Sequence, residues 1–174
     1  QYYLADVVRS FQALGRTLTE APFQAVALLG LLISLGAALA SVPAGRASDR
    51  LGRKPLIYLS GAGLGLLMAF LLLFPRYDLL LALALVFGLF YGVYLAVDWA
   101  LVADVLKDPE AHATDMGLWQ TAIVVPQVLA GAFGRPLDLL NAQTPGLGYQ
   151  VLYLLAALFF LLGAFGVAGV RRSR

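Results

Sequence analysis

Apolar residues run in long stretches along this chain, and short polar segments separate them. The apolar stretches cover residues of about 22–43, 55–74, 79–105, 114–134 and 150–170. A helix over the first of them would be roughly 33 Å long, which is enough for a hydrocarbon core of about 30 Å. Residues 1–8 look like the end of a preceding helix. The pattern predicts an all-α, polytopic membrane bundle with five complete transmembrane helices and the end of a sixth.

The segments between these stretches are interpreted as connections. Residues 7–20 are read as a polar connection and residues 135–149 as a loop, and Pro126 is expected to kink the fourth helix. The chain begins in apolar-aromatic sequence, so we expect it to continue upstream in a longer protein.

Composition supports lipid as the main partner. Of the 174 residues, 61% are hydrophobic and 13% charged, and the mean hydropathy is +0.84. Absence of cysteine excludes disulfides and thiolate metal sites, and a single histidine makes a zinc site unexpected. The sequence also lacks the Gly-x-Ser-x-Gly pattern of a nucleophilic hydrolase. We therefore expect no enzyme activity, no cofactor, no metal and no nucleic-acid partner.

Positive charge is distributed unevenly between the two sides of the predicted bundle. One side would carry Arg46, Arg50, Arg53, Lys54, Lys107, Arg171, Arg172 and Arg174. The other would carry only Arg9, Arg16, Arg76 and Arg135. The richer side is expected in the cytoplasm, which places the 45–55 connection and the C-terminus there, in an inner-membrane protein.

The densest charge cluster lies between the first two spans and is predicted to be a tight basic hairpin. It reads Gly45-x-x-x-Asp49-Arg50-x-Gly52-Arg53-Lys54. Glycines permit a sharp turn and close helix approach, and the carboxylate can pair with neighbouring cations. Such a cluster could latch two helix ends in one conformation. The alternative is a simple positive-inside anchor.

This segment resembles the signature loop of the major facilitator superfamily at all of its defining positions. The resemblance implies the second copy of the loop, between helices 8 and 9. The chain would then be the C-terminal half of a twelve-helix fold, helices 7–12, with a missing N-terminal half as its partner. It also favours Asp104 as a partner for Arg50 or Arg53 in a cytoplasmic gate, the alternative being a solvated helix-end carboxylate.

Residues 101–106, 115–119 and 125–127 resemble sugar–cation symporters, nearest the sucrose-transporter-like branch of the glycoside–pentoside–hexuronide group. This resemblance implies secondary active transport of a small polar solute, such as a sugar, by alternating access with H⁺ or Na⁺ coupling. A multidrug or metabolite exporter of the same fold and a non-transporting scaffold remain as alternatives.

Asp98 interrupts the third apolar stretch. A carboxylate at a helix centre costs about 2.5–3.5 kcal/mol on insertion scales, so it should face protein or water. Tyr91 and Tyr94 share its helical face, and the three side chains could hydrogen-bond a polyhydroxylated substrate, with Asp98 binding the coupling ion. Alternatively, Asp98 is a structural carboxylate paired with a basic group in the missing half.

Two further patterns concern helix surfaces. Gln120 and Gln127 share one face of the fourth span, where they could bind sugar hydroxyls or join that helix to a neighbour. Small residues are predicted to let helices approach closely. They form the pairs Gly61/Gly65 and Gly88/Gly92 and the row Ala27, Gly30, Ser34, Ala38, Ser41 and Gly45.

Overall fold

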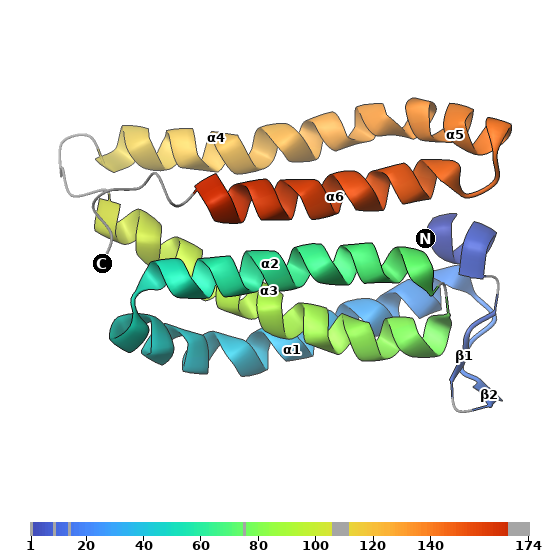
Figure 1. Ribbon diagram of the computed structural model, residues 1–174, viewed down its shortest axis with the longest axis horizontal. Helices are drawn as coiled ribbons and strands as arrows, with labels where there is room; N and C mark the ends of the chain where they lie inside the picture. Colours follow the sequence, from blue (N-terminus) through green and yellow to red (C-terminus); the bar gives the residue numbers. More distant parts are fainter. Residues whose placement is uncertain (1, 9, 14, 75, 106–111, 167–174) are drawn as a thin grey trace.

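The computed structural model describes residues 2–8, 10–13, 15–74, 76–105 and 112–166, with the backbone alone at 72, 103–105 and 112. The chain is almost entirely helical (Figure 1). The helices are α1 Pro22–Leu51, α2 Arg53–Leu73, α3 Tyr77–Val105, α4 His112–Ala130, α5 Gly134–Gln143 and α6 Leu147–Gly166. Between α4 and α5 lies the 3-10 turn η2, Gly131–Phe133. At the N-terminal end, the π-helical turn η1, Leu4–Val8, precedes a small antiparallel hairpin of β1, Gln12–Ala13, and β2, Arg16–Thr17.

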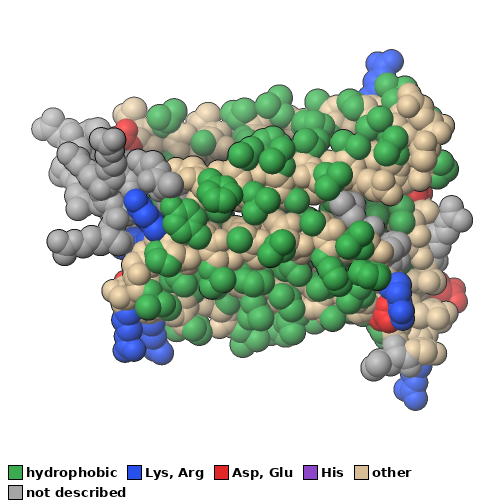
Figure 2. All heavy atoms as spheres, viewed as in Figure 1, with side chains coloured by type: hydrophobic (Ala, Val, Ile, Leu, Met, Phe, Trp, Pro, Cys, Tyr) green, Lys and Arg blue, Asp and Glu red, His purple; other side chains and the backbone are tan. Residues whose placement is uncertain are grey.

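The predicted membrane architecture is confirmed. Five helical segments in the described part of the chain are long and apolar enough to cross a membrane. Figure 2 shows hydrophobic side chains over the middle of the visible face and charged side chains at its two ends. This distribution is expected when lipid surrounds the middle of a bundle and water bathes its ends. The chain is therefore an integral membrane protein.

The helices lie side by side, with α4 and α5 along one edge of the bundle and α1 along the other (Figure 1). The most extensive contact joins α1 to α3, followed by those of α2 with α6 and with α3. No described side chain from residue 113 to residue 143 is buried, so α4 and α5 form a peripheral layer. The turn between α1 and α2 lies at the same end of the bundle as the end of α3 and the start of α4.

Glycine makes the closest helix contacts, and the predicted packing of both pairs is confirmed. A Cβ placed on Gly88 or Gly92 of α3 would collide with backbone atoms of Ile33 or Ala37 in α1. A Cβ on Gly61 would come within 2.6 Å of the Ala164 Cβ in α6. These glycines are therefore required by close helix approach, as is common where lipid supplies no hydrophobic drive.

The predicted small-residue row on α1 is wrong for contacts within the described chain. Gly30 and Gly45 have no atom within 4 Å of an added Cβ, and Ala27, Ser34 and Ala38 are exposed. The buried row is instead Ala25, Gly36, Ala40, Ala44 and Ser48. Both rows repeat at helical spacing, and only the second faces α3.

Two predicted connections are helical. The α1 helix continues through Pro43 to Leu51, so the segment 45–55 is not a loop and its turn is confined to Gly52. Residues 134–143 form α5 where a loop was expected. In both places the helix includes polar residues that follow an apolar stretch. Hydropathy marks where a span leaves the lipid, whereas the helix ends where capping or glycine ends it.

Candidate functional site

Asp98 belongs to a row of side chains on one face of α3, and the first member of this row contacts α6. The row comprises Phe87, Tyr91, Tyr94 and Asp98, spaced four, three and four residues apart, which keeps them on one helical face. Phe87 stacks on Tyr91 with ring centroids 6.0 Å apart. It also meets the edge of Phe160 in α6 at 6.4 Å. These ring contacts place the Phe87 end of the row beside α6.

The other faces of α3 are occupied differently. Gly88 and Gly92 lie against α1, while Val97 and Leu101 are buried in a cluster with Leu56 and Ile57 of α2. A further face is open, because Val86 is 37% exposed and Leu89 39%. Asp98 shares none of these three faces. Tyr91, in the same row as Asp98, is also 36% exposed, so the face that carries the carboxylate is only partly covered within the described chain.

Asp98 is half-buried. Within the part of the chain that the structure describes, its carboxylate forms no hydrogen bond and no ion pair. The one ion pair between described residues joins Arg76 to Asp78 at the start of α3, with nitrogen and oxygen 2.7 Å apart. The prediction of a carboxylate inside the bundle therefore agrees with the position of Asp98, and its binding role stays a prediction.

A tryptophan pair connects this part of α3 to α4. Trp99 and Trp119 meet edge to face with centroids 4.4 Å apart. Trp99 directly follows Asp98, and Trp119 directly precedes Gln120. The predicted residues Asp98 and Gln120 therefore lie on helices that touch next to them. Both Gln120 and Gln127 are exposed. Gln127 lies two turns farther along α4, and the structure gives it no contact with the row on α3.

The predicted gate motif has one conformationally required residue. Gly52 has φ of +86° and ψ of 163°, a combination that only glycine adopts readily, and its N–H donates to the Ser48 carbonyl at 3.0 Å. Gly45 lies inside α1 and has no such requirement. Gly52 thus forms a helix–Gly–helix turn at one end of the bundle, and the role of the motif as a gate stays a prediction.

The charged members of the motif lie on both sides of that turn. Asp49 and Arg50 are exposed in the last turn of α1, and Arg53 and Lys54 begin α2 half-buried. The predicted pairing of Asp104 with Arg50 or Arg53 lies outside the described residues, because only the backbone of Asp104 is described. One buried group of the motif was not predicted. Ser48 is 4% exposed, and its hydroxyl has no hydrogen-bond partner among the described residues.

Sequence reasoning also missed a tyrosine and carboxylate cluster at the opposite end of the bundle. Tyr149 donates a hydrogen bond to Asp6 with the oxygens 2.5 Å apart. Tyr3 meets the rings of Tyr149 and Tyr153 edge to face at 5.5 and 5.1 Å. The members come from the two ends of the chain, so no local pattern relates them. The only signal was the unusual tyrosine content of residues 2–3 and 149–153.

Comparison with known proteins identifies the family. Residues 7–173 match the family described as Major Facilitator Superfamily, which is nearly the whole chain. Comparisons with curated proteins and with solved structures each gave no match. The matched range contains the glycine turn and all five candidate spans. This chain belongs to the Major Facilitator Superfamily, whose members are transporters rather than enzymes.

Proposed function

We propose that this chain is the C-terminal half of a twelve-helix secondary active transporter for a small polar solute, such as a sugar. Alternating access would move the solute across the inner membrane, coupled to H⁺ or Na⁺. The observation that carries the proposal is Asp98, a half-buried carboxylate without an ion-pair partner in the described chain, in an otherwise apolar span of α3. Such a group is a default candidate for binding a substrate or an ion.

The neighbours of Asp98 support a polar solute. Tyr91 and Tyr94 supply hydroxyls on the same helical face, and tyrosine combines a hydrogen-bonding group with an apolar ring. A sugar presents hydroxyls at its edges and C–H groups on its faces, so it can use both properties. Gln120, on the adjoining helix, adds an amide that can donate and accept. Gln127 would join the site only if the missing half encloses it.

The carboxylate also supports coupling. In transporters of this kind the site lies near the midplane between two repeats or halves. A carboxylate there binds a proton or Na⁺ because either cation removes its net charge before it moves into a low-dielectric surrounding. Coupling requires that cation binding changes how readily the transporter reorients between the two sides of the membrane. Asp98 is the residue of this row that can provide that difference.

The test uses the intact protein in proteoliposomes, with radiolabelled sugars and imposed H⁺ or Na⁺ gradients. Asp98→Asn should abolish gradient-driven accumulation, while exchange of sugar at equal concentrations on both sides persists, because exchange needs no net ion movement. Asp78→Asn is the matched control, since Asp78 lies on the same helix but pairs with Arg76 at the surface. Full accumulation by the Asp98→Asn variant would exclude Asp98 as the coupling residue.

The proposed sidedness places the Gly52 turn in the cytoplasm as one part of a gate, with Asp104 as its expected partner. This chain contains no cysteine, so an introduced cysteine is its single labelling site, and any cysteines in the other half are first replaced by serine. Arg50→Cys should react with a membrane-impermeant maleimide only in inside-out vesicles. Arg76→Cys, at the exposed start of α3, should react only in right-side-out vesicles. The reverse pattern would overturn the assigned orientation.

A further inference from the structure

A large cavity opens beside the tyrosine and carboxylate cluster, away from Asp98. Its volume is about 930 Å³, and it is bounded by the N-terminal segment, α2, the α4–α5 region and α6. Ligand pockets for small molecules are typically about 300–1,000 Å³. The charged residues in its described lining are the two aspartates Asp6 and Asp138, and four tyrosines join them. This cavity is therefore aromatic and electronegative.

The two carboxylates are not equivalent. Asp6 already accepts the hydrogen bond from Tyr149. Asp138 forms neither a hydrogen bond nor an ion pair with any residue that the structure describes, although it lines the same cavity. It lies on α5 just before the tight α5–α6 turn, where Asn141 accepts a hydrogen bond of 2.9 Å from the Gly148 N–H. Asp138 is exposed, and a carboxylate at the cavity wall without a cationic partner among the described residues suits a cationic ligand.

The tyrosine rings favour an organic cation over a hydrated metal ion. Tyr149 and Tyr153 each stand nearly perpendicular to Tyr3, at 71° and 78°. The cavity wall therefore contains rings in different orientations. Alkylammonium groups are attracted to the faces of aromatic rings, and sites for quaternary ammonium ions use several rings. A small inorganic cation would instead require converging oxygen ligands.

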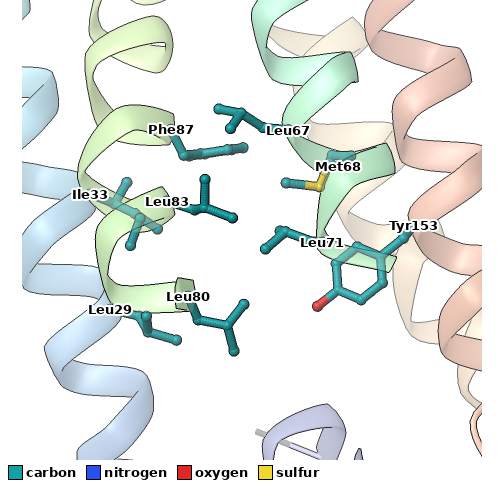
Figure 3. Close-up of a pocket in the computed structure, with 10 residues that line it drawn as sticks. Leu29, Ile33, Leu67, Met68, Leu71, Leu80, Leu83, Phe87 and Tyr153 are labelled. Atoms are coloured by element: carbon teal, nitrogen blue, oxygen red, sulfur yellow. The ribbon is translucent and has the colours of Figure 1, made fainter. Parts of the chain in front are cut away.

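A second, apolar cavity of about 170 Å³ adjoins the first and lies between α1, α2, α3 and α6 (Figure 3). Met68 and Tyr153 line both cavities. In Figure 3 the Tyr153 ring extends from α6 toward this space, among leucines of α2 and α3. The apolar cavity could thus receive a hydrocarbon group attached to a cation that is bound beside Asp138.

We propose that the cavity between the N-terminal segment, α5 and α6 binds organic ammonium ions that carry an apolar group. Asp138 neutralises the charge, and the rings of Tyr3 and Tyr153 contact the alkyl groups around the nitrogen. The ligand is a free alkylammonium solute or an ethanolamine lipid headgroup, because both have the same chemistry. This site is separate from Asp98 and does not depend on the transport reaction proposed above.

Binding is measured by titration calorimetry on the intact protein in phosphatidylglycerol nanodiscs, which contain no ammonium headgroups. Choline should bind at least about tenfold more tightly than dimethylbutanol, its neutral isostere, since the charge and its aromatic contacts are lost. Butyltrimethylammonium should bind more tightly than tetramethylammonium because its butyl group enters the apolar cavity. Equal affinity for choline and dimethylbutanol, or preference for a neutral sugar, would overturn the proposal.

Variants locate the site. Asp138→Asn should weaken choline binding about tenfold, whereas Glu20→Gln, which removes an exposed carboxylate that does not line the cavity, should have no effect. Tyr153→Phe should retain binding, because the ring is kept, and Tyr153→Leu should weaken it. Asp98→Asn should leave choline affinity unchanged, which separates this site from the proposed transport site. Unaltered binding by Asp138→Asn would refute the assignment.

A competition experiment with added lipid distinguishes the two sources of ligand. If phosphatidylethanolamine added to the nanodiscs competes with choline, the occupant is the lipid headgroup. If it does not compete, the site serves free ammonium solutes. Melting temperatures of all variants show whether a loss of binding reflects unfolding. Should Tyr153→Leu unfold, the Asp138→Asn and Tyr153→Phe pair still decides the outcome.

Discussion

The Tyr77 hydroxyl, at the start of α3, donates a hydrogen bond of 3.0 Å to the Ala25 carbonyl oxygen, at the start of α1. Tyr77 is 2% exposed and Ala25 is fully buried. Phe11 packs edge to face on the Tyr77 ring with centroids 5.3 Å apart. This single side chain therefore joins the N-terminal hairpin, α1 and α3 at one end of the bundle.

Replacing Tyr77 by Phe should lower the stability of the bundle. The change keeps the ring contacts and removes one buried hydrogen bond, so the expected loss is about 1 kcal/mol. Thermal unfolding in detergent, followed by circular dichroism, measures the effect. Tyr58→Phe is the control, because Tyr58 forms no hydrogen bond with the residues that the structure describes. Equal melting temperatures for both variants would contradict the prediction.

Gly88→Ala should destabilise the α1–α3 contact. The new methyl group would collide with the Ile33 backbone, which cannot move aside as a side chain can. Overpacking of this kind costs about 1–3 kcal/mol. Gly163→Ala, in α6, meets nothing within 4 Å and should be neutral or stabilising. Melting temperatures of the two variants provide the comparison, and a stable Gly88→Ala protein would show that the helices are not so closely apposed.

The two glycines of the gate motif should respond oppositely to alanine. Gly52→Ala forces a side chain into a backbone conformation that costs about 1–3 kcal/mol, so the turn between α1 and α2 should weaken. Gly45→Ala adds a methyl group to a helical position with open space around it and should not lower stability. Limited proteolysis at the turn and thermal unfolding measure both. Equal destabilisation by the two substitutions would argue that Gly45 is also held in a close contact.

The tryptophan pair should give an optical signal. Both tryptophans of the chain lie in the contact between α3 and α4, with centroids 4.4 Å apart and planes at 71°. Such a geometry couples their electronic transitions, which produces a couplet in the circular dichroism spectrum. Trp119→Phe and Trp99→Phe should each abolish the couplet. A couplet that survives either substitution would mean that α3 and α4 do not meet at these residues.

Much of the fold could be predicted from sequence because the lipid solvent imposes a strong constraint on apolar length. The five long apolar stretches predicted the number of spans that the described chain contains. The ends of α1 were less predictable, since Arg46, Asp49 and Arg50 leave the lipid without leaving the helix. For the same reason, the polar residues of α5 were predicted to form a loop although they are helical.

The candidate sites were predictable only in part. Asp98 was evident because a charge inside an apolar stretch is rare. The neighbour of its row was not, because the contact of Phe87 with Phe160 joins residues of α3 and α6 that are far apart in the sequence. The Asp138 cavity was hidden for a related reason. Its walls come from the N-terminal segment, α2, α5 and α6, and the sequence predicted a loop where α5 lies.

The glycine contacts between α1 and α3 also limit how the protein can change shape. Gly36 lies against Leu85 and Leu89, while Gly88 and Gly92 lie against Ile33 and Ala37. Sliding either helix by one residue would put a bulky side chain where only a hydrogen atom fits. These two helices must therefore travel as one rigid body. Displacement of helices relative to one another during a transport cycle is therefore expected at the weaker contacts, first of all at those of the sparsely packed α4.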